Sequence, residues 1–451
     1  MQLPWLTVDA VPAVDFAALR RRAIFECCKW DPQIEDVCAL SSQPIVLRST
    51  AWTELAAMAE QLANETITAE NAIVRQPKLI DDLGLPRALR RELMKLCRRR
   101  DADSNARDVR LIRFDFHFTA DGWRISEANS DVPGGFNEAS GFARLVAAHL
   151  GDVVLPGDPT RDLAKAVANS VAGTGRAGSG TIALVHATAF TDDRQVMEFF
   201  CRELRQMGLS PVLVAPDHLR WNEGQPFIET EWFSGPVDFV FRFFPAEWLP
   251  QLPRSCAWPH LLGDSLAGLC NPGTSILTQS KRFPLVWGRL EADLPNWRAL
   301  LPRTFTPRAA RTQLAPERIV WKCALGRVGD FIGMHGITSL KESRAIASNV
   351  RWHPGHWIAQ ERFDAVPMRC SAGDLFPCIG VYTVNGKASG AYGRLARTPL
   401  INHLAQDGAV LIDGISGTRD FRATPTAGGI DTIPHRHAFH EFKRTLSNLG
   451  A

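Results

Sequence analysis

The sequence lacks any run of eighteen apolar residues, and its first residues lack a basic stretch followed by an apolar one. A helix that spans a membrane needs about 20 predominantly apolar residues, and a secretory signal needs that basic-then-apolar order. Because neither pattern is present, we expect a cytoplasmic protein with no membrane partner.

Paired cysteine motifs are also missing. The ten cysteines form no CxxC pair, and their spacing does not match a zinc ribbon. Cysteines of a reducing compartment are seldom bridged. We therefore expect buried free thiols rather than disulfides or a zinc site.

A marked excess of one charge is absent as well. The 451 residues include 51 Lys and Arg against 48 Asp and Glu, and 45% of them are hydrophobic. This composition is typical of a globular chain of two or three domains. The small net charge gives no general reason to expect a nucleic-acid partner. A basic helix over residues 86–100 leaves that alternative open, although a solvated helix face explains the same pattern.

The first part of the chain is predicted to be mainly helical. Apolar residues recur at helical spacing after Ser49 and Thr50, which we expect to cap a helix that continues towards Glu70. A second helix is predicted to begin at Pro86 and to end in basic residues near position 100.

The most informative stretch is Arg113 to Asn129, which predicts a β-hairpin. Phenylalanines alternate with polar residues along its first strand, so one face enters a core and the other presents polar groups. With a three-residue loop at 120–122, Asp115 faces Glu127 and Arg113 faces Asn129. Four polar side chains then share one small patch.

Two facing carboxylates repel each other, so a chain keeps such a pair where a cation or a shared proton compensates. Magnesium takes oxygen ligands, commonly one or two carboxylates with substrate phosphates and water, and an amide oxygen is an acceptable addition. Asp115, Glu127 and Asn129 are therefore a candidate Mg²⁺ site, with Arg113 directed at an anion beside the metal. The alternative is a surface hairpin in which Arg113 pairs with a carboxylate.

The residues after the hairpin predict a turn and a helix. A Pro-Gly-Gly turn leads to Asn137, which we expect to cap a helix that runs to about Leu150. Asp131 and Glu138 are expected to extend the acidic cluster of the hairpin.

A βαβ unit is predicted next. Residues 173–178 match a dinucleotide-binding fingerprint literally, but that fingerprint needs a strand before it, and here the strand follows. We interpret these glycines as a linker. The predicted elements are strands over 181–187, 211–215 and 237–243 and a helix over 192–207.

A lysine and a glycine-rich loop follow. Lys322 is predicted on a strand that leads into a loop with Gly326 and Gly329, and Lys281 lies where a loop meets an apolar helix. Backbone N–H groups of such a loop can bind phosphate oxygens while lysine supplies a cation, although the Walker spacing is absent. A glycine-rich hairpin with an exposed lysine explains the same residues.

The last part of the chain predicts a strand over 357–363 and a hairpin with Asn385-Gly386 in its turn. Arg394 and Arg397 follow that hairpin. One of them is a candidate for contact with an anionic substrate, and the alternative is that both are solvated. The histidines near position 437 lack partners at ligand spacing, so we expect a surface tail there rather than a metal site.

Together these segments resemble the glutathionylspermidine synthase family of circularly permuted ATP-grasp ligases. The family motif runs R-F-D, then D-G, then E-x-N-x-D-x-P before a helix that begins near E-A, and RFDFHFTADGWRISEANSDVPGGFNEA is similar to it. Further similar segments are KWDPQ, FRFFPAEW, QSKRFPLVW, VWKCALGRVG, WIAQERF and GRLAR. The resemblance therefore spans most of the chain.

The resemblance implies a role for each of several residues. It implies metal ligands at Asp115, Glu127 and Asn129, stabilisation of the developing negative charge by Arg113, phosphate contacts from Lys281 and Lys322, a phosphate loop at Gly326, Arg327 and Gly329, adenine-side contacts at Gln360 and Glu361, and a mobile arginine at Arg394. Three departures from the family pattern leave the substrate open: Lys322-Cys323 for K-P, Arg327-Val328-Gly329 for R-E-G, and Asp131-Val132-Pro133-Gly134 for D-T-P-T.

The predicted fold class is α/β (α+β): an ATP-grasp ligase fold of the glutathionylspermidine synthase type, with a βαβ Rossmann-like preATP-grasp portion and a helical N-terminal segment. The expected segments are 1–105 (helical), 106–172 (metal-site hairpin), 173–275 (βαβ) and 276–451 (nucleotide-binding subdomains and tail).

The predicted reaction joins a peptide or glutathione-like acid to an amine or polyamine through an acyl phosphate, with ATP and Mg²⁺ as cofactors. The alternative is a non-catalytic nucleotide-binding regulatory protein that keeps the fold. The expected partners are these small molecules, and a homodimer is left open.

Overall fold

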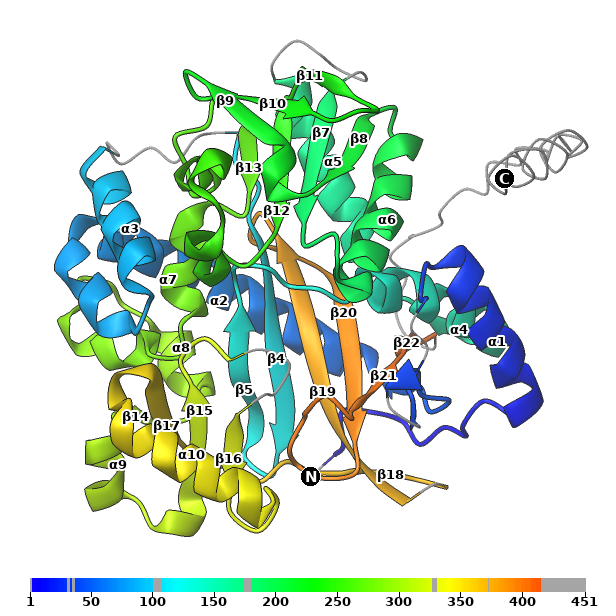
Figure 1. The fold of residues 1–451 in the computed structure, drawn as a ribbon. Helices are drawn as coiled ribbons and strands as arrows, with labels where there is room; N and C mark the ends of the chain where they lie inside the picture. The colour runs from blue at the N-terminus through cyan, green and yellow to red at the C-terminus, as the bar shows by residue number, and fades with distance from the viewer. Residues whose placement is uncertain are drawn as a thin grey trace, which may run out of the picture. The chain divides into compact units, whose positions relative to one another are not determined.

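A central antiparallel sheet carries the strands of the predicted hairpin. Its strand order is β21-β20-β19-β4-β5, with β18 paired to β19 (Figure 1). The computed structural model describes residues 2–30, 33–34, 37–99, 107–173, 180–326, 331–371 and 373–414. The strands are β4 (Leu111–Thr119), β5 (Gly122–Asn129), β18 (Met368–Cys370), β19 (Gly373–Val384), β20 (Lys387–Ala396) and β21 (Gln406–Gly408).

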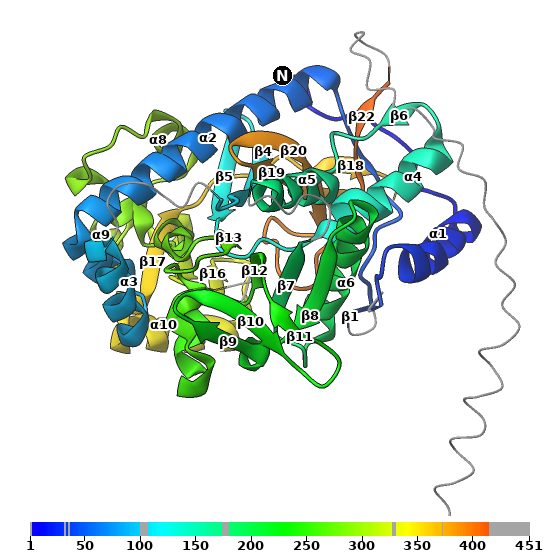
Figure 2. The same ribbon diagram turned by 90° about the horizontal axis from the view of Figure 1, so that it is seen from above.

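One face of this sheet is buried under the long helix α2 (Ser49–Arg75), which lies across β19 and β20 (Figure 2). Leu55, Leu62, Phe114 and Phe116 are fully buried in the same core. The predicted alternation along the first hairpin strand is confirmed, because its phenylalanines enter this core. The polar residues of that strand are left on the opposite face.

The predicted βαβ unit is confirmed. Strands β7 (Thr181–His186) and β8 (Ser210–Val214) pair in parallel, and α6 (Thr191–Gln206) connects them. Strands β12 (Phe239–Phe243) and β13 (Gly268–Cys270) complete a parallel sheet of order β13-β12-β7-β8. All five residues of strand 239–243 are buried, and all but Arg242 are apolar, which is typical of a parallel sheet covered on both faces.

A second antiparallel sheet carries Lys322. Its order is β14-β17-β15-β16. The predicted strand around Lys322 is confirmed as β15, and the strand predicted over 357–363 is confirmed as the shorter β17. Its elements are β14 (Thr304–Phe305), β15 (Ile319–Cys323), β16 (Ile332–Met334), β17 (Trp357–Glu361), α9 (Pro307–Gln313) and α10 (Leu340–Trp352).

Shorter elements connect these sheets. The remaining helices are α1 (Ala13–Glu26), α3 (Arg87–Arg99), a π-helical turn (Asn137–Phe142), α4 (Ala143–Leu150), α5 (Pro159–Ala172), α7 (Ile276–Gln279) and α8 (Pro295–Leu300). The remaining strands are β1 (Gln33–Ile34), β2 (Val37–Cys38), β3 (Ile45–Leu47), β6 (Val153–Val154), β9 (Leu219–Asn222), β10 (Gln225–Glu229), β11 (Ser234–Pro236) and β22 (Val410–Asp413).

Two predicted caps are wrong. Arg48 occupies the N-cap of α2 without a side-chain cap, and the N–H of Ser49 donates to the Asp413 carboxylate at 2.8 Å. Asn137 lies inside the π-helical turn, and its buried amide donates to the carbonyl of Cys27 at 2.9 Å. At Ser49 a tertiary carboxylate accepts the N–H that a local cap would have accepted, whereas at Asn137 the side chain donates to another element instead of accepting a helix N–H.

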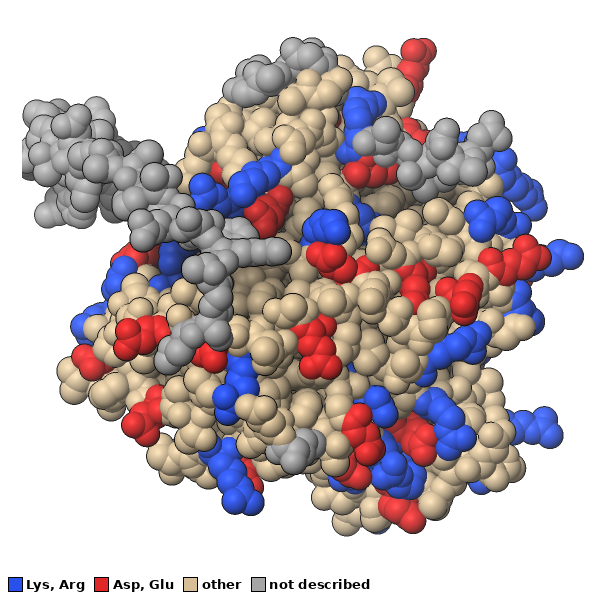
Figure 3. All heavy atoms as spheres, turned by 180° about the vertical axis from the view of Figure 1, so that it is seen from behind, with Lys and Arg blue, Asp and Glu red and all other residues tan. Residues whose placement is uncertain are grey.

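The basic helix α3 has acidic neighbours. Arg90 pairs with Asp81 at 2.8 Å, and Arg99 pairs with Asp264 at 2.8 Å. On the face seen in Figure 3, cationic and anionic side chains alternate over the surface. These pairs support the interpretation of α3 as a solvated, salt-bridged helix.

All ten cysteines are free thiols, and seven of them are buried, which confirms the prediction of unbridged side chains. Within the described ranges, no helix is both long and apolar enough to cross a membrane. Residues up to Gly414 form one compact unit. The boundaries predicted at 105, 172 and 275 stay predictions, and the histidine-containing tail lies outside the described residues.

Candidate functional site

A cavity of about 640 Å³ opens on the polar face of the central sheet. Side chains from β4, β5, β19 and β20 form one wall, and side chains from β15, β16 and β17 form another. The first residues of α6 also line it. Two separate sheets and a helix thus meet at this cavity, so its residues come from distant parts of the sequence.

The register predicted for the hairpin is confirmed, although the predicted loop is wrong. Asp115 faces Glu127 and Arg113 faces Asn129. The turn has two residues rather than three, and Thr119 pairs with Gly122. A β-bulge at Ser126 inserts the missing residue and restores the register. A bulge of this kind also redirects the backbone.

Each carboxylate of the facing pair has its own cation. Arg113 donates from Nε and Nη2 to the two oxygens of Asp115, at 2.7 and 3.0 Å. Lys281 Nζ lies 2.9 Å from Glu127 Oε2. The Asn129 amide donates to Asp115 Oδ2 at 3.0 Å. The alternative of a surface hairpin was therefore right that Arg113 pairs with a carboxylate. It was wrong that the pair lies at the surface, because Asp115 is only 8% exposed.

Of the two predicted lysines, Lys322 lines the cavity, and Lys281 contacts Glu127, which also lines it. Lys281 Nζ donates to the carbonyl of Gly326 at 2.7 Å as well as pairing with Glu127. Lys322 Nζ donates to Gln360 Oε1 at 2.8 Å and to the carbonyl of the bulged Ser126 at 3.0 Å. The alternative of an exposed lysine on a glycine hairpin is wrong for Lys322, which is buried.

Burial and charge shift several pKa values here. Burial acts to raise the pKa of Glu127, but Lys281 and Lys322 outweigh it and hold that pKa well below its usual range. Burial lowers the pKa of Lys322 to about 8 against the opposing pull of Glu127. Burial, together with the charge of Lys322, lowers the pKa of His117 to about 3. His117 is therefore neutral at pH 7.

The donor set suits a hard cation. Asp115, Glu127 and Asn129 present carboxylate and amide oxygens in one patch, which Mg²⁺ accepts when phosphates and water complete its octahedron. In the described part of the chain no three His, Cys, Asp or Glu residues form a metal cluster by themselves. The patch fits a metal that shares its ligands with a nucleotide rather than a metal held by protein alone.

Two other predicted site residues, Glu361 and Arg394, already have hydrogen-bond partners within the protein. Glu361 lines the cavity, but its carboxylate also accepts from Arg303 at 2.8 Å, and that hydrogen bond lowers its pKa. Arg394 lies within β20 rather than after the hairpin, and its Nη2 donates to the carbonyl of Asn402 at 2.7 Å. Arg327 and Gly329 lie outside the described residues.

Asp131 does not extend the acidic cluster. It is fully buried and pairs with Arg242 at 2.6 Å, with neither side chain exposed. Its other carboxylate oxygen accepts the N–H of Ala246 at 2.9 Å. Asp131 therefore stabilises the fold behind the cavity and does not line the cavity.

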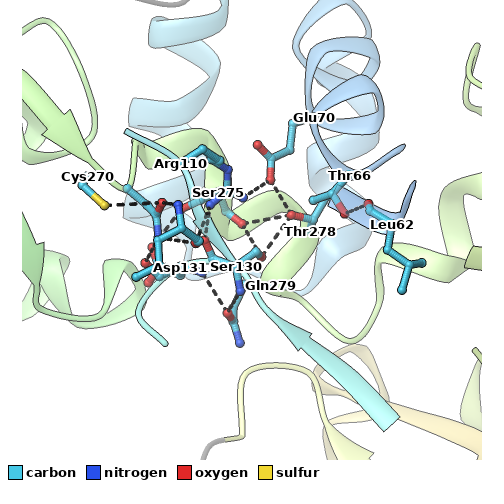
Figure 4. A network of polar contacts seen from close by, with 12 residues as sticks. Leu62, Thr66, Glu70, Arg110, Ser130, Asp131, Cys270, Ser275, Thr278 and Gln279 are labelled. Atoms are coloured by element: carbon cyan, nitrogen blue, oxygen red, sulfur yellow. Dashed lines mark hydrogen bonds and ion pairs between the residues drawn. The ribbon is translucent and has the colours of Figure 1, made fainter. Parts of the chain in front are cut away.

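A buried polar network joins the end of the hairpin to the segment that carries Gln279 and Lys281 (Figure 4). Gln279 Oε1 accepts the backbone N–H groups of Ser130 and Asp131 at 2.8 and 3.0 Å. Ser130 directly follows Asn129, and Gln279 precedes Lys281 by two residues. One side chain thus holds the end of the hairpin next to the segment that carries Lys281.

Comparison with known families supplies the identification. The family described as glutathionylspermidine synthase preATP-grasp matches residues 40–410. The chain belongs to the glutathionylspermidine synthase family. This confirms the predicted resemblance and the predicted ATP-grasp ligase fold, and it supports a ligase in general terms.

Other comparisons find more distant similarity or none. The search of curated proteins found no match. Among solved structures, a protein assigned as a gamma-glutamylcysteine synthetase from Methylobacillus flagellatus is 13% identical, with 76% of this chain and 85% of that chain covered and a TM-score of 0.38. D-alanyl-alanine synthetase A from Vibrio cholerae is 15% identical, with 49% and 68% covered and a TM-score of 0.32.

The sequence reasoning missed a second charged cluster in this glutathionylspermidine synthase family member. Lys29 Nζ lies 2.6 Å from Glu138 Oε1 and 3.3 Å from Asp407 Oδ2. The Tyr392 hydroxyl donates to Asp407 Oδ1 at 2.5 Å. These four side chains line the cavity. The available signal was the family-like segment KWDPQ, which contains Lys29 but was assigned no role.

Proposed function

We propose that this protein is an ATP-dependent ligase that joins a carboxylate to an amine through an acyl phosphate and releases ADP and phosphate. The observation that supports this best is the meeting of two carboxylates and the buried Lys322 in the lining of one cavity, with Lys281 paired to one of these carboxylates. Such an arrangement suits the β and γ phosphates of a nucleotide with their metal. Membership of the glutathionylspermidine synthase family agrees with it.

The nucleotide end is formed by the hairpin and the Lys322 sheet. Lys281 and Lys322 would neutralise phosphate charge, and Gln360, which already orients Lys322, would lie on the adenine side. Asp115, Glu127 and Asn129 would hold Mg²⁺, which supplies charge neutralisation and orientation of the phosphates when bound. Fixed cations at these positions favour attack by a carboxylate on the γ phosphorus.

Arg113 lines the same cavity and pairs with Asp115. Its guanidinium would stabilise the oxyanion that forms when the amine attacks the carbonyl of the acyl phosphate. A fixed donor of this kind is worth roughly 10²–10³ in kcat.

The second charged cluster, formed by Lys29, Glu138, Tyr392 and Asp407, suits an amine. Glu138 Oε2 has no hydrogen-bond partner although Glu138 is only 5% exposed. Burial raises the pKa of Glu138, with Asp407 adding to that shift and Lys29 opposing it. A carboxylate with a raised pKa is suited to accept the proton that an ammonium must lose before it attacks. The proposed substrates are therefore a peptide or glutathione-like acid and an amine or polyamine.

The nucleotide products test the proposal. ADP and phosphate are expected in strict proportion to the amide, and only slowly without both acid and amine, since a water-excluded site protects the acyl phosphate. Pools of acids and amines should be screened by mass for a product one water lighter than the pair. AMP and pyrophosphate would contradict the acyl-phosphate route. Tight ATP binding without hydrolysis for any pair would favour the regulatory alternative.

The lowered pKa of Lys322 gives a second expected result. At pH 8.5 ATP binding should take up a proton, because the free side chain, with a pKa of about 8, is mostly neutral and bound phosphates raise that pKa. At pH 6.5 Lys322 is already charged, so no uptake is expected from it. Affinity should fall by up to about tenfold per pH unit above 8.

Calorimetry in two buffers of different ionisation enthalpy measures this uptake. The matched control is Lys322→Arg, whose guanidinium stays charged throughout. If the wild type and this variant take up the same number of protons at pH 8.5, Lys322 does not contact the phosphates.

A further inference from the structure

The sequence contains two tyrosines, and both lie beside Arg113. The Arg113 guanidinium carbon is 5.0 Å from the ring centroid of Tyr392 and 6.0 Å from that of Tyr382. Cations within about 6 Å of a ring face are attracted to it, most strongly where water is excluded. Tyr382 is fully buried, and Arg113 and Tyr392 line the cavity with the Arg113 side chain only 12% exposed, so water is largely excluded from these contacts.

The β19–β20 hairpin places the two rings. Tyr382 lies opposite Arg113 in the register of β19 with β4, and Tyr392 lies opposite Gly380 in the register of β19 with β20. A Cβ atom at Gly380 would lie 2.7 Å from Arg113 Cδ. A Cβ atom at Gly135 would lie 2.9 Å from the Tyr382 hydroxyl and 3.1 Å from the Tyr392 ring. Because Gly380 and Gly135 have no side chains, the two rings and the guanidinium can come close to one another.

Each ring is held at its hydroxyl. The Tyr382 hydroxyl donates to the carbonyl of Gly134, which also accepts from Arg113 Nη1 at 2.9 Å. The Tyr392 hydroxyl donates to Asp407 at 2.5 Å. The rings are therefore fixed by contacts that do not depend on Asp115.

This independence matters because Asp115 has two roles. It is the ion-pair partner of Arg113 and also a proposed metal ligand, and a carboxylate that turns to a divalent cation gives up part of that pair. Arg113 would then need other contacts to stay at the cavity wall. The two ring faces and the Gly134 carbonyl are the contacts that remain.

We propose that Tyr382 and Tyr392 are positioning residues that keep the Arg113 guanidinium at the cavity wall when the Asp115 carboxylate binds the metal. This inference rests on the proposed function, because it assumes that Asp115 binds a metal. The contact between the rings and Arg113 does not depend on that assumption, and the experiments test the contact and the metal separately.

The first experiment uses no activity. Incorporation of 3-fluorotyrosine gives two ¹⁹F resonances, which Tyr392→Phe assigns. Arg113→Met should shift both resonances, whereas Arg298→Met, which removes a guanidinium 5.5 Å from the Trp287 ring, should shift neither. Unchanged resonances in folded Arg113→Met would overturn the proposed contact, whatever the protein catalyses.

The second part of that experiment adds Mg²⁺ and a non-hydrolysable ATP analogue. Both resonances of the wild type should move, since the guanidinium loses a negative partner, and Asp115→Asn should remove the Mg²⁺-dependent part of the shift. If Mg²⁺ with the analogue moves neither resonance although calorimetry shows binding, the positioning role is wrong. If no nucleotide binds, the proposed function fails while the Arg113→Met comparison stands.

Steady-state kinetics of the full chain give the second experiment. Tyr392→Leu removes the ring and should lower kcat about tenfold, as expected for one desolvated cation–π contact, with the KM for ATP within about twofold. Tyr392→Phe keeps the ring and should restore kcat to within about threefold. The control Phe305→Leu removes a ring that lies 5.6 Å from Arg303 and should leave kcat unchanged. Equal losses in Tyr392→Phe and Tyr392→Leu would contradict positioning by the ring.

Discussion

Asp115→Asn and Glu127→Gln are each expected to lower turnover by at least about 10³-fold while the protein stays folded. Each change keeps the shape of the side chain and removes the negative charge that would bind the metal. The folded state should survive because the amide oxygen still accepts a hydrogen bond from the neighbouring cation. The lost pairing costs about 1–3 kcal/mol, against a typical total stability of about 5–15 kcal/mol.

Turnover, thermal melting and the Mg²⁺ dependence of nucleotide binding measure this result. The matched control is Glu26→Gln, which removes a surface carboxylate that pairs with Arg22 at 2.7 Å and does not line the cavity. Near-normal activity of either site variant at limiting Mg²⁺ would show that the metal assignment is wrong.

Asp131→Asn is expected to reduce the free energy of unfolding by about 3–5 kcal/mol, because it leaves Arg242 charged, buried and without its ion-pair partner. Neither side chain of this pair is exposed, and Arg242 also donates to the carbonyls of Phe244 and Asn271. Backbone carbonyls do not replace the missing negative charge. Urea denaturation measures the loss.

Two further variants control for the size of this effect. Arg22→Gln breaks an ion pair whose side chains are each 50% exposed, and it should cost at most about 1 kcal/mol. The double variant Asp131→Leu with Arg242→Met should be more stable than Asp131→Asn, since it removes both charges together. A double variant no more stable than the single one would show that packing, not charge, determines the cost.

The hairpin shows how much of the site can be predicted from the sequence. Alternating phenylalanines fixed which face of β4 enters the core, and a one-residue slip would have buried Arg113 and Asp115 there instead. Asp115 lies opposite Glu127 although the predicted loop was one residue too long, because the bulge at Ser126 makes up the difference. The bulge at Ser126 was not predictable from the local pattern, because its carbonyl is used by Lys322, which is 196 residues away in the sequence.

The wrong predictions share a cause. Asn137 and Ser49 have the residue types of helix caps, and Asp131 continues an acidic run, so local rules favoured those roles. In the structure each has a partner from another element: Cys27 for Asn137, Asp413 for Ser49 and Arg242 for Asp131. Tertiary partners outweigh local preferences because a buried hydrogen-bonding group without a partner costs more than a lost cap.

By itself, the sequence determined the residue types of the site, the periodicity of its strands and the family motif that connects them. These features depend on residues close together in the chain. Only the tertiary structure decided which cation compensates each carboxylate, and it also brought Lys29 to Asp407 and both tyrosines to Arg113. Contacts of this kind arise where separate sheets meet. Their geometry is set by the packing of whole elements, which no short sequence pattern specifies.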